Sequence, residues 1–310
     1  MSHLGVSPIT DPIGEFGPST RAAVELFQRQ RGLRIDGIVG RGTWSTLVEA
    51  GLHLGSRLLY RTQPMQRGDD VAELQSRLCS LGFDTGRVDG IFGDATAQAV
   101  AEFQRNIQLP TDAMAGALTI DELVRVSARH QTLALVTTVR EAEARREQTH
   151  TLRGSHVGIG EGGGLSTVAG ALHRQLASHG ARVTLLSHPD ESAQAVEANQ
   201  GAVDLYVGLR LVPATTGCTT AFYSGYSYES VGGRLLAEEI AQVMEEIFDD
   251  PTDVRGMTLP VLRETRMPAV VVEIGPLEIA VERSGLIAEA LARAIVAWAT
   301  AADAEPPSSA

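Results

Sequence analysis

The sequence predicts two structural parts: small all-α repeats in the first part of the chain, and an α/β domain, with a mixed sheet flanked by helices, in the second. A pattern of residues in the first part recurs at a fixed offset, which is typical of small units that follow one another along a chain. After residue 150, short β-branched runs alternate with amphipathic segments, as in layered α/β domains. The length of 310 residues and the apolar fraction of 43% allow each part its own core.

The repeat is clearest around Phe16 and Phe92, which are 76 residues apart. After both positions Gly, Thr, Ala-Val and Phe-Gln follow at the same spacing, and further matches continue downstream without a gap. In each copy Ala, Val and Phe fall on one face of a helix, because they stand at i, i+1 and i+4. Thr20 and Thr96 stand where a helix N-cap or first turn belongs. We therefore expect helical units that bury one apolar face.

The second unit also carries G-D-D-V-x-x-L-Q-x-x-L from residue 68, L-G from residue 81 and V-D-G-x-F-G from residue 88. With the Phe-Gln pair at residue 103, these motifs resemble the tandem helical peptidoglycan-binding domains of bacterial wall proteins. The resemblance implies that the repeats bind peptidoglycan. The residues themselves indicate a structural role, since phenylalanines at helical spacing more often form a core than a surface that binds a ligand.

The first unit is shorter than the second. In the second, an amphipathic helix predicted over about residues 69–80 precedes Leu81-Gly82, whereas the chain begins almost at the equivalent Leu4-Gly5. The missing half-unit would leave the apolar side of the remaining helices uncovered. We favour a true start upstream of Met1 over a decayed unit, and an export signal could then precede this residue too.

The composition excludes several classes of function. A net charge of −12 disfavours nucleic acid and anionic membrane surfaces as partners, because both require a basic face. The sequence holds no apolar run of about eighteen residues, so no transmembrane segment is expected. Two cysteines, Cys79 and Cys218, are too few for a disulfide scaffold. With no visible signal peptide, these features favour a cytoplasmic protein, although an incomplete N-terminus would leave export open.

The second part alternates strand and helix patterns. Helices are predicted where apolar residues recur at helical spacing, and strands where β-branched residues cluster between turn residues. The predicted strands are residues 155–159, 181–186, 205–209, 220–223 and 269–274. The predicted helices are residues 165–179, 192–199, 230–247 and 285–300.

Four stretches of this part resemble, in the right order, the zinc-dependent N-acetylmuramoyl-L-alanine amidases. The first is the helix predicted at 165–179 with the G-A-R-V that follows it, and the next two are A-N at residue 198 and A-V-D-L at residue 202. The fourth, L-R-E-T-R-M-P-A-V-V-V-E-I-G over residues 262–275, is similar to the family segment that contains the catalytic glutamate. Together they cover nearly all of residues 155–300.

The resemblance implies a zinc site with His, Glu and His as ligands and a further glutamate as general acid/base. Glu273 stands at the position of the acid/base, and Arg210, at the end of V-D-L-Y-V-G-L-R, stands at that of the last histidine. Gly163 occupies the position of the first histidine, in a shortened loop. Glu161 fits the zinc-binding glutamate when counted back from Gly180, and a loop proline when counted forward from the first strand.

Arg210 argues against a metal at this position. A guanidinium stays protonated and has no lone pair to offer a cation. Losing one of three ligands also removes a large share of the roughly 10–16 kcal/mol that structural zinc sites supply. We therefore expect no cofactor, with zinc only under the alternative of unconventional ligands. We hypothesise that Arg210 fills the position that the zinc ion would occupy and pairs with Glu273 or with Glu161.

Other chemistries have weaker support. Residues 160–164 form a glycine-rich loop before a helix but lack the spacing and the Lys-Ser/Thr pair of a phosphate-binding loop, which favours a tight turn. Cys218 has no histidine nearby in the sequence, so a core position is expected. His156, on the first predicted strand, is interpreted as structural. His150 is the only other histidine near the loop, and His173, His179 and His188 are interpreted as non-functional.

Peptidoglycan-binding repeats combined with an amidase-like domain stripped of metal ligands resemble the CwlM-type regulators of actinobacteria. The resemblance implies a cytoplasmic role in the production of peptidoglycan precursors, with the amidase-like domain binding partners. Three functions stay open. The favoured one is a non-catalytic regulator that binds peptidoglycan, its precursors or a peptidoglycan-synthesis enzyme. The others are a zinc-dependent amidase with unconventional ligands and a passive peptidoglycan-binding adaptor.

The predicted domain boundaries follow from these assignments. We expect an incomplete repeat at residues 1–52, a repeat at 63–126, a linker at 127–150, a degenerate amidase-like domain at 151–303 and a tail at 304–310. The linker is expected to be helical, because it is rich in helix formers and in mixed charges at i,i+4.

Overall fold

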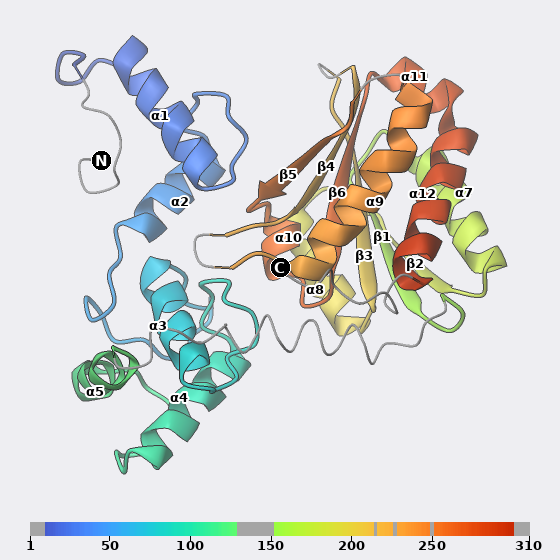
Figure 1. The fold of residues 1–310 in the computed structure, drawn as a ribbon. Coiled ribbons are helices and arrows are strands. Elements are labelled where there is room, and N and C mark those ends of the chain that lie inside the picture. The colour runs from blue at the N-terminus through green and yellow to red at the C-terminus, as the bar shows by residue number, and fades with distance from the viewer. Residues whose placement is uncertain (1–9, 129–151, 214–215, 226–227, 249–250, 301–310) are drawn as a thin grey trace, which may run out of the picture. The chain divides into compact units, whose positions relative to one another are not determined.

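The computed structural model describes residues 10–128, 152–213, 216–225, 228–248 and 251–300 (Figure 1). Described residues up to 128 belong to one compact unit, and those from 152 on, except 225–228, belong to another. Most of the predicted linker, the predicted tail, His150 and the Leu4-Gly5 motif lie outside the described residues. No helix in the described ranges is long and apolar enough to cross a lipid bilayer.

Each helix of the first unit begins directly after a glycine. The helices are α1 (Pro18–Gln30), α2 (Arg41–Ala50), α3 (Asp69–Ser80), α4 (Asp94–Asn106) and α5 (Ala117–Ser127). The preceding N-cap glycines are Gly17, Gly40, Gly68, Gly93 and Gly116. Thr20 and Thr96 lie in the first turns of α1 and α4, one of the two positions predicted for them.

A buried glutamine joins the two helices of each successive pair. Its Nε2 donates to an aspartate carboxylate, to a backbone carbonyl and to a threonine hydroxyl of the second helix. The Nε2–Oδ1 distances are 2.8 Å for Gln28–Asp36, 3.0 Å for Gln75–Asp89 and 2.8 Å for Gln104–Asp112, and the hydroxyls belong to Thr43, Thr96 and Thr119. The structural repeat is therefore a helix pair that occurs as α1–α2, α3–α4 and α4–α5. The 76-residue repeat in the sequence reveals only α1–α2 and α4–α5.

The first helix pair has no counterpart of α3 before it within the described residues. In the second repeat α3 covers a core to which Phe92 and Ile120 belong, and these are 0% and 6% exposed. Their counterparts 76 residues earlier, Phe16 and Trp44, are 58% and 64% exposed. The same sequence pattern thus forms a core in one repeat and an exposed apolar face in the other.

The second unit is built on a six-stranded sheet with the order β2-β1-β3-β6-β4-β5. The strands are β1 (His156–Glu161), β2 (Arg182–Leu186), β3 (Leu205–Leu211), β4 (Gly217–Tyr223), β5 (Asp253–Met257) and β6 (Ala269–Gly275). The β4–β6 pair is antiparallel and the other neighbours are parallel, which confirms the predicted mixed sheet. The sequence patterns miss β5, because its residues D-V-R-G-M show no apolar alternation and are mostly exposed.

Helices cover both faces of this sheet (Figure 1). One face is covered by α7 (Ser166–Ser178), α9 (Val231–Phe248) and α12 (Ser284–Thr300), and α12 packs against both of the others. The other is covered by α8 (Glu191–Gln200) and the short α10 (Pro260–Glu264). A further short helix, α11 (Leu277–Glu282), joins β6 to α12.

The side chains of β3 alternate between the two faces, as in any strand. Val207 and Leu209 lie in the apolar core under α7, α9 and α12. Tyr206 points to the opposite face, where its hydroxyl donates to Gln194 of α8. Arg210 must therefore extend from the α8 face, at the carboxyl end of the strand.

Candidate functional site

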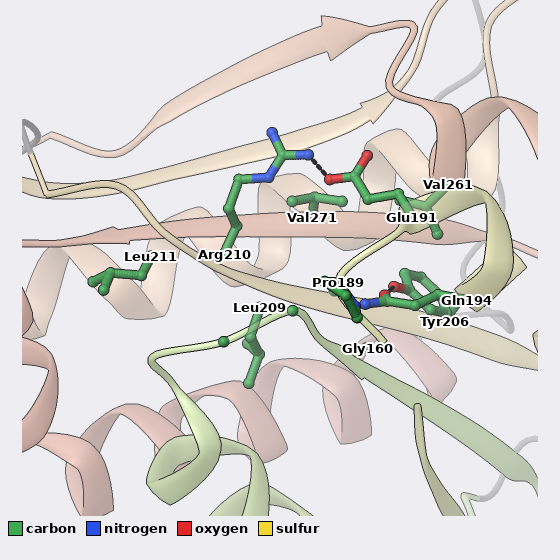
Figure 2. A pocket seen from close by; sticks show the side chains of 13 residues that line it. Gly160, Pro189, Glu191, Gln194, Tyr206, Leu209, Arg210, Leu211, Val261 and Val271 are labelled. Atoms are coloured by element: carbon green, nitrogen blue, oxygen red, sulfur yellow. Dashed lines mark hydrogen bonds and ion pairs between the residues drawn. The ribbon is translucent and has the colours of Figure 1, made fainter. Parts of the chain in front are cut away.

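A pocket of about 230 Å³ lies at the carboxyl ends of β1 and β3, beside the start of α8. Figure 2 shows Glu191, Gln194, Tyr206 and Arg210 around it. In the sheet, β2 lies next to β1 on one side and β3 lies next to β1 on the other, so the strand order reverses direction at β1. Such a switch point is where open α/β sheets commonly bind ligands.

Arg210 contacts two carboxylates from different elements. It lies opposite Glu273 in the β3–β6 register, and its Nη1 donates to Glu273 Oε1 at 3.0 Å. Its Nη2 forms an ion pair with Glu191, and Figure 2 shows these two side chains pointing toward one another. The side chains of Arg210, Glu191 and Glu273 are 25%, 24% and 11% exposed, so water shields the group only in part. The hypothesised pairing of Arg210 with Glu273 is therefore present.

The start of α8 holds Glu191 in place. Asp190 caps the helix, and its carboxylate accepts a hydrogen bond of 2.9 Å from the backbone N–H of Ser192. Glu191 is the first helical residue, where the positive end of the helix dipole favours a negative side chain. At the other end of α8, Asn199 donates to the Glu264 carbonyl at 2.8 Å, which ties the helix to α10.

Glu161 lies on the other face of the sheet, so the alternative pairing with Arg210 is wrong. It is the last residue of β1 and lies opposite Leu209, whose side chain belongs to the core under α7. Its Oε1 accepts hydrogen bonds from the backbone N–H groups of Gly163 (2.8 Å) and Leu165 (2.9 Å). The carboxylate thus fixes the turn between β1 and α7. This position agrees with the count forward from the first strand.

The glycines after β1 form the tight turn that the sequence predicts. Gly163 and Gly164 have φ angles of 129° and 96°, a region that other residues rarely adopt. A histidine at Gly163, where the amidase resemblance would place one, would therefore strain the backbone. Gly160 lies at the pocket floor, where any side chain would collide with Tyr206 and Gln194.

These residues do not fit the zinc ion that the amidase resemblance implies. Such a site needs three protein ligands, and two carboxylates bonded to a permanent cation do not supply them. The described parts of the chain contain no group of three or more His, Cys, Asp or Glu side chains arranged to hold a metal. His156 lies at the opposite end of β1, where its ring contacts Thr184 Oγ1 at 2.7 Å and Arg182 Nη2 at 3.0 Å.

Cys218 also lacks the surroundings of a nucleophile. It is buried on β4 in the core face, opposite Ile274 of β6. Burial raises the pKa of its thiol to about 12, and the negative charge of Glu273 adds to the effect. Reactive cysteines have a lowered pKa instead. The thiol is therefore a core group, as the sequence predicts.

A family model and a known protein match large parts of the chain. A family model described as "Putative peptidoglycan binding domain" matches residues 2–47 and 67–123. The N-acetylmuramoyl-L-alanine amidase CwlM of Mycobacterium tuberculosis is 35% identical over 285 residues, covering 82% of this chain and 70% of that protein. The chain belongs to the CwlM family of N-acetylmuramoyl-L-alanine amidases.

Two further matches each cover one part of this CwlM-family chain. A spore cortex-lytic enzyme of Bacillus cereus is 42% identical over 85 residues, which are 26% of this chain and 33% of that protein. Among solved structures, the N-acetylmuramoyl-L-alanine amidase AmiC2 of Nostoc punctiforme is 18% identical, with a TM-score of 0.39. That match covers 46% of this chain and 96% of the amidase.

Proposed function

We propose that this chain is a non-catalytic amidase-fold protein that regulates peptidoglycan synthesis in the cytoplasm. It would bind peptidoglycan, its precursors or an enzyme of their synthesis, and it would use no metal. One observation carries the proposal: Arg210 is held between Glu191 and Glu273 where the amidase motif calls for a zinc-binding histidine.

Electrostatics favours this interpretation over zinc-dependent hydrolysis. Two unit charges 4 Å apart interact by about 4 kcal/mol at an effective dielectric constant of 20, and a divalent ion doubles the repulsion from Arg210. Glu273, which would have to take a proton from a zinc-bound water, is already an acceptor for the Arg210 guanidinium. The pair therefore opposes both metal binding and base catalysis.

Zinc analysis of three proteins tests the proposal. We expect the purified chain, dialysed against zinc, to hold far less than one zinc ion per chain and to release no peptide from muramyl peptides. Arg210→His should raise the zinc content, because an imidazole would then stand beside Glu191 and Glu273. Arg210→Gln is the matched control, since it removes the charge without adding a ligand.

Two results would contradict the proposal. Stoichiometric zinc together with cleavage in the unmodified chain would establish an amidase with unconventional ligands. An unchanged zinc content in Arg210→His would show that Arg210 is not what keeps the metal out.

A passive peptidoglycan-binding adaptor is the second candidate. It is favoured by the match of residues 2–47 and 67–123 to the peptidoglycan-binding family model. This function needs only the helical repeats and assigns no role to the pocket beside Arg210. The adaptor would bind only peptidoglycan, whereas the regulator would act on precursor synthesis, through a precursor or an enzyme.

A further inference from the structure

We infer that the pocket beside Arg210 binds a primary ammonium group on a short aliphatic stem, the chemistry of a diamino-acid side chain. The inference rests on the proposed function, in which Arg210 rather than a metal occupies the strand ends. It assigns a ligand to the pocket that the loss of hydrolysis would otherwise leave without a role.

The charges around the pocket favour a cation. Glu191 and Arg210 line it, and Glu273 lies behind Arg210. Two carboxylates and one guanidinium leave a net charge of −1 on these three side chains, and Glu191 is open enough for a ligand to reach it. A ligand carboxylate or phosphate would have to compete with Glu191 and Glu273 for the Arg210 donors.

A buried hydrogen-bond acceptor lies beside this charge. Tyr206 is 1% exposed and lines the pocket. Burial raises the pKa of its phenol, so the hydroxyl keeps its proton, and that proton is donated to Gln194. The oxygen retains lone pairs, and no described residue donates a hydrogen bond to it. Gln194 follows Glu191 by three residues on α8, which puts the carboxylate and the phenol on the same side of the pocket.

The remaining lining suits a short apolar stem. Pro189, Val261 and Val271 contribute apolar surface near these acceptors. The volume of about 230 Å³ lies below the roughly 300–1,000 Å³ of pockets for drug-sized ligands. This volume suits a single amino-acid side chain. An ammonium group has three donors and no acceptor, which matches a pair formed by a carboxylate and a phenolic oxygen.

Titration of the full chain with matched probes tests the inference. The probes are Nα-acetyl-lysine methylamide, its Nε-acetylated form, and Nα-acetyl-glutamate methylamide, with binding followed by calorimetry or by NMR shifts. We expect the ammonium probe to bind at least about tenfold more tightly than the other two, the difference typical of one charged hydrogen bond. Equal binding of the probes, tighter binding of the anionic one, or no binding at all overturns the inference.

Variants locate the site. Glu191→Gln should weaken binding of the ammonium probe by about tenfold. Glu197→Gln, at an exposed position of the same helix, should leave it unchanged. Gly162→Leu should abolish binding by filling the pocket, because a Cβ at Gly162 meets only ordinary contacts. Full affinity in both Glu191→Gln and Gly162→Leu overturns the assignment.

The outcome is separable from that of the proposed function. Stoichiometric zinc in the unmodified chain defeats the proposed function whatever the probes do. A zinc-free chain that does not prefer the ammonium probe defeats only the ligand assignment.

Discussion

Arg210 connects three elements through one planar group. A guanidinium presents several donors in a fixed fork, so it can bond two carboxylates at once, whereas a lysine offers a single point charge. Here the fork reaches Glu273 on the neighbouring strand and Glu191 at the start of α8. The charge thus fastens β3, β6 and α8 at the place where the pocket opens.

We expect Arg210→Leu to lower the free energy of unfolding by about 1–3 kcal/mol, because Glu273 would become a mostly buried carboxylate without this counter-ion. Adding Glu273→Leu should recover part of the loss, since replacing both members of a buried pair with apolar residues is often nearly neutral. Urea denaturation of the single and double variants measures the coupling, with exposed Glu197→Gln as control. Strictly additive effects would contradict a stabilising pair.

Arg210 and Glu273 could be found from the sequence because each ends or interrupts an apolar strand within a longer recognisable stretch. Glu191 could not, since its role depends on where α8 begins and on how that helix docks against the sheet. The only local signal is Asp190, a good N-cap residue after a proline. Glu161 remained ambiguous because the sequence does not fix the length of a loop, whereas the backbone shows where β1 ends.

The helix pairs show that the same structural repeat can form with its apolar face either covered or exposed. Each pair is held by an internal glutamine network, so α1 and α2 can form without the cover that α3 gives to α4 and α5. The 76-residue offset relates Gln28 to Gln104, but Gln75 lies outside it, so the α3–α4 copy of the network could not be found from the repeat. Long amphipathic helices could be predicted from their periodicity. The edge strand β5 and the short α10 and α11 have too few residues to show one.

Two equivalent substitutions should therefore have unequal effects. We expect Ile120→Ala to lower the free energy of unfolding by about 2–5 kcal/mol, because it opens a cavity in the core of the second repeat. Trp44 is the counterpart of Ile120 in the first repeat. Because Trp44 is exposed, Trp44→Ala should change the free energy of unfolding by less than about 0.5 kcal/mol. Thermal and urea denaturation of both variants measure the difference. A large loss in Trp44→Ala would mean that another group covers this face.

At the scale of the whole molecule, the chain combines two units with separate cores. The helical unit has a core around α3, α4 and α5, and the α/β unit has a larger one under α7, α9 and α12. The division into helical repeats and an α/β domain could be predicted, because periodicity and repeats act over long stretches. Which partner the units bind depends on surfaces that leave no pattern in the sequence.

We expect the immobilised full chain to retrieve an enzyme of peptidoglycan-precursor synthesis from a cytoplasmic extract, detected by mass spectrometry. The same beads carrying an unrelated protein of similar acidity serve as control, because a net charge of −12 alone can attract basic proteins. A passive adaptor would behave differently. It would sediment with insoluble peptidoglycan and retrieve no such enzyme, and that result would decide for the second candidate.

The turn after β1 makes a return to hydrolysis difficult under the proposed function. Point substitutions can change Arg210, but a histidine at Gly163 would meet a backbone conformation that suits glycine, and Glu161 anchors that conformation to the start of α7. Recovery would require inserted residues as well as exchanged ones. Directed evolution restricted to point mutations should therefore fail to revive an amidase from this scaffold, whereas loop grafting has a feasible starting point.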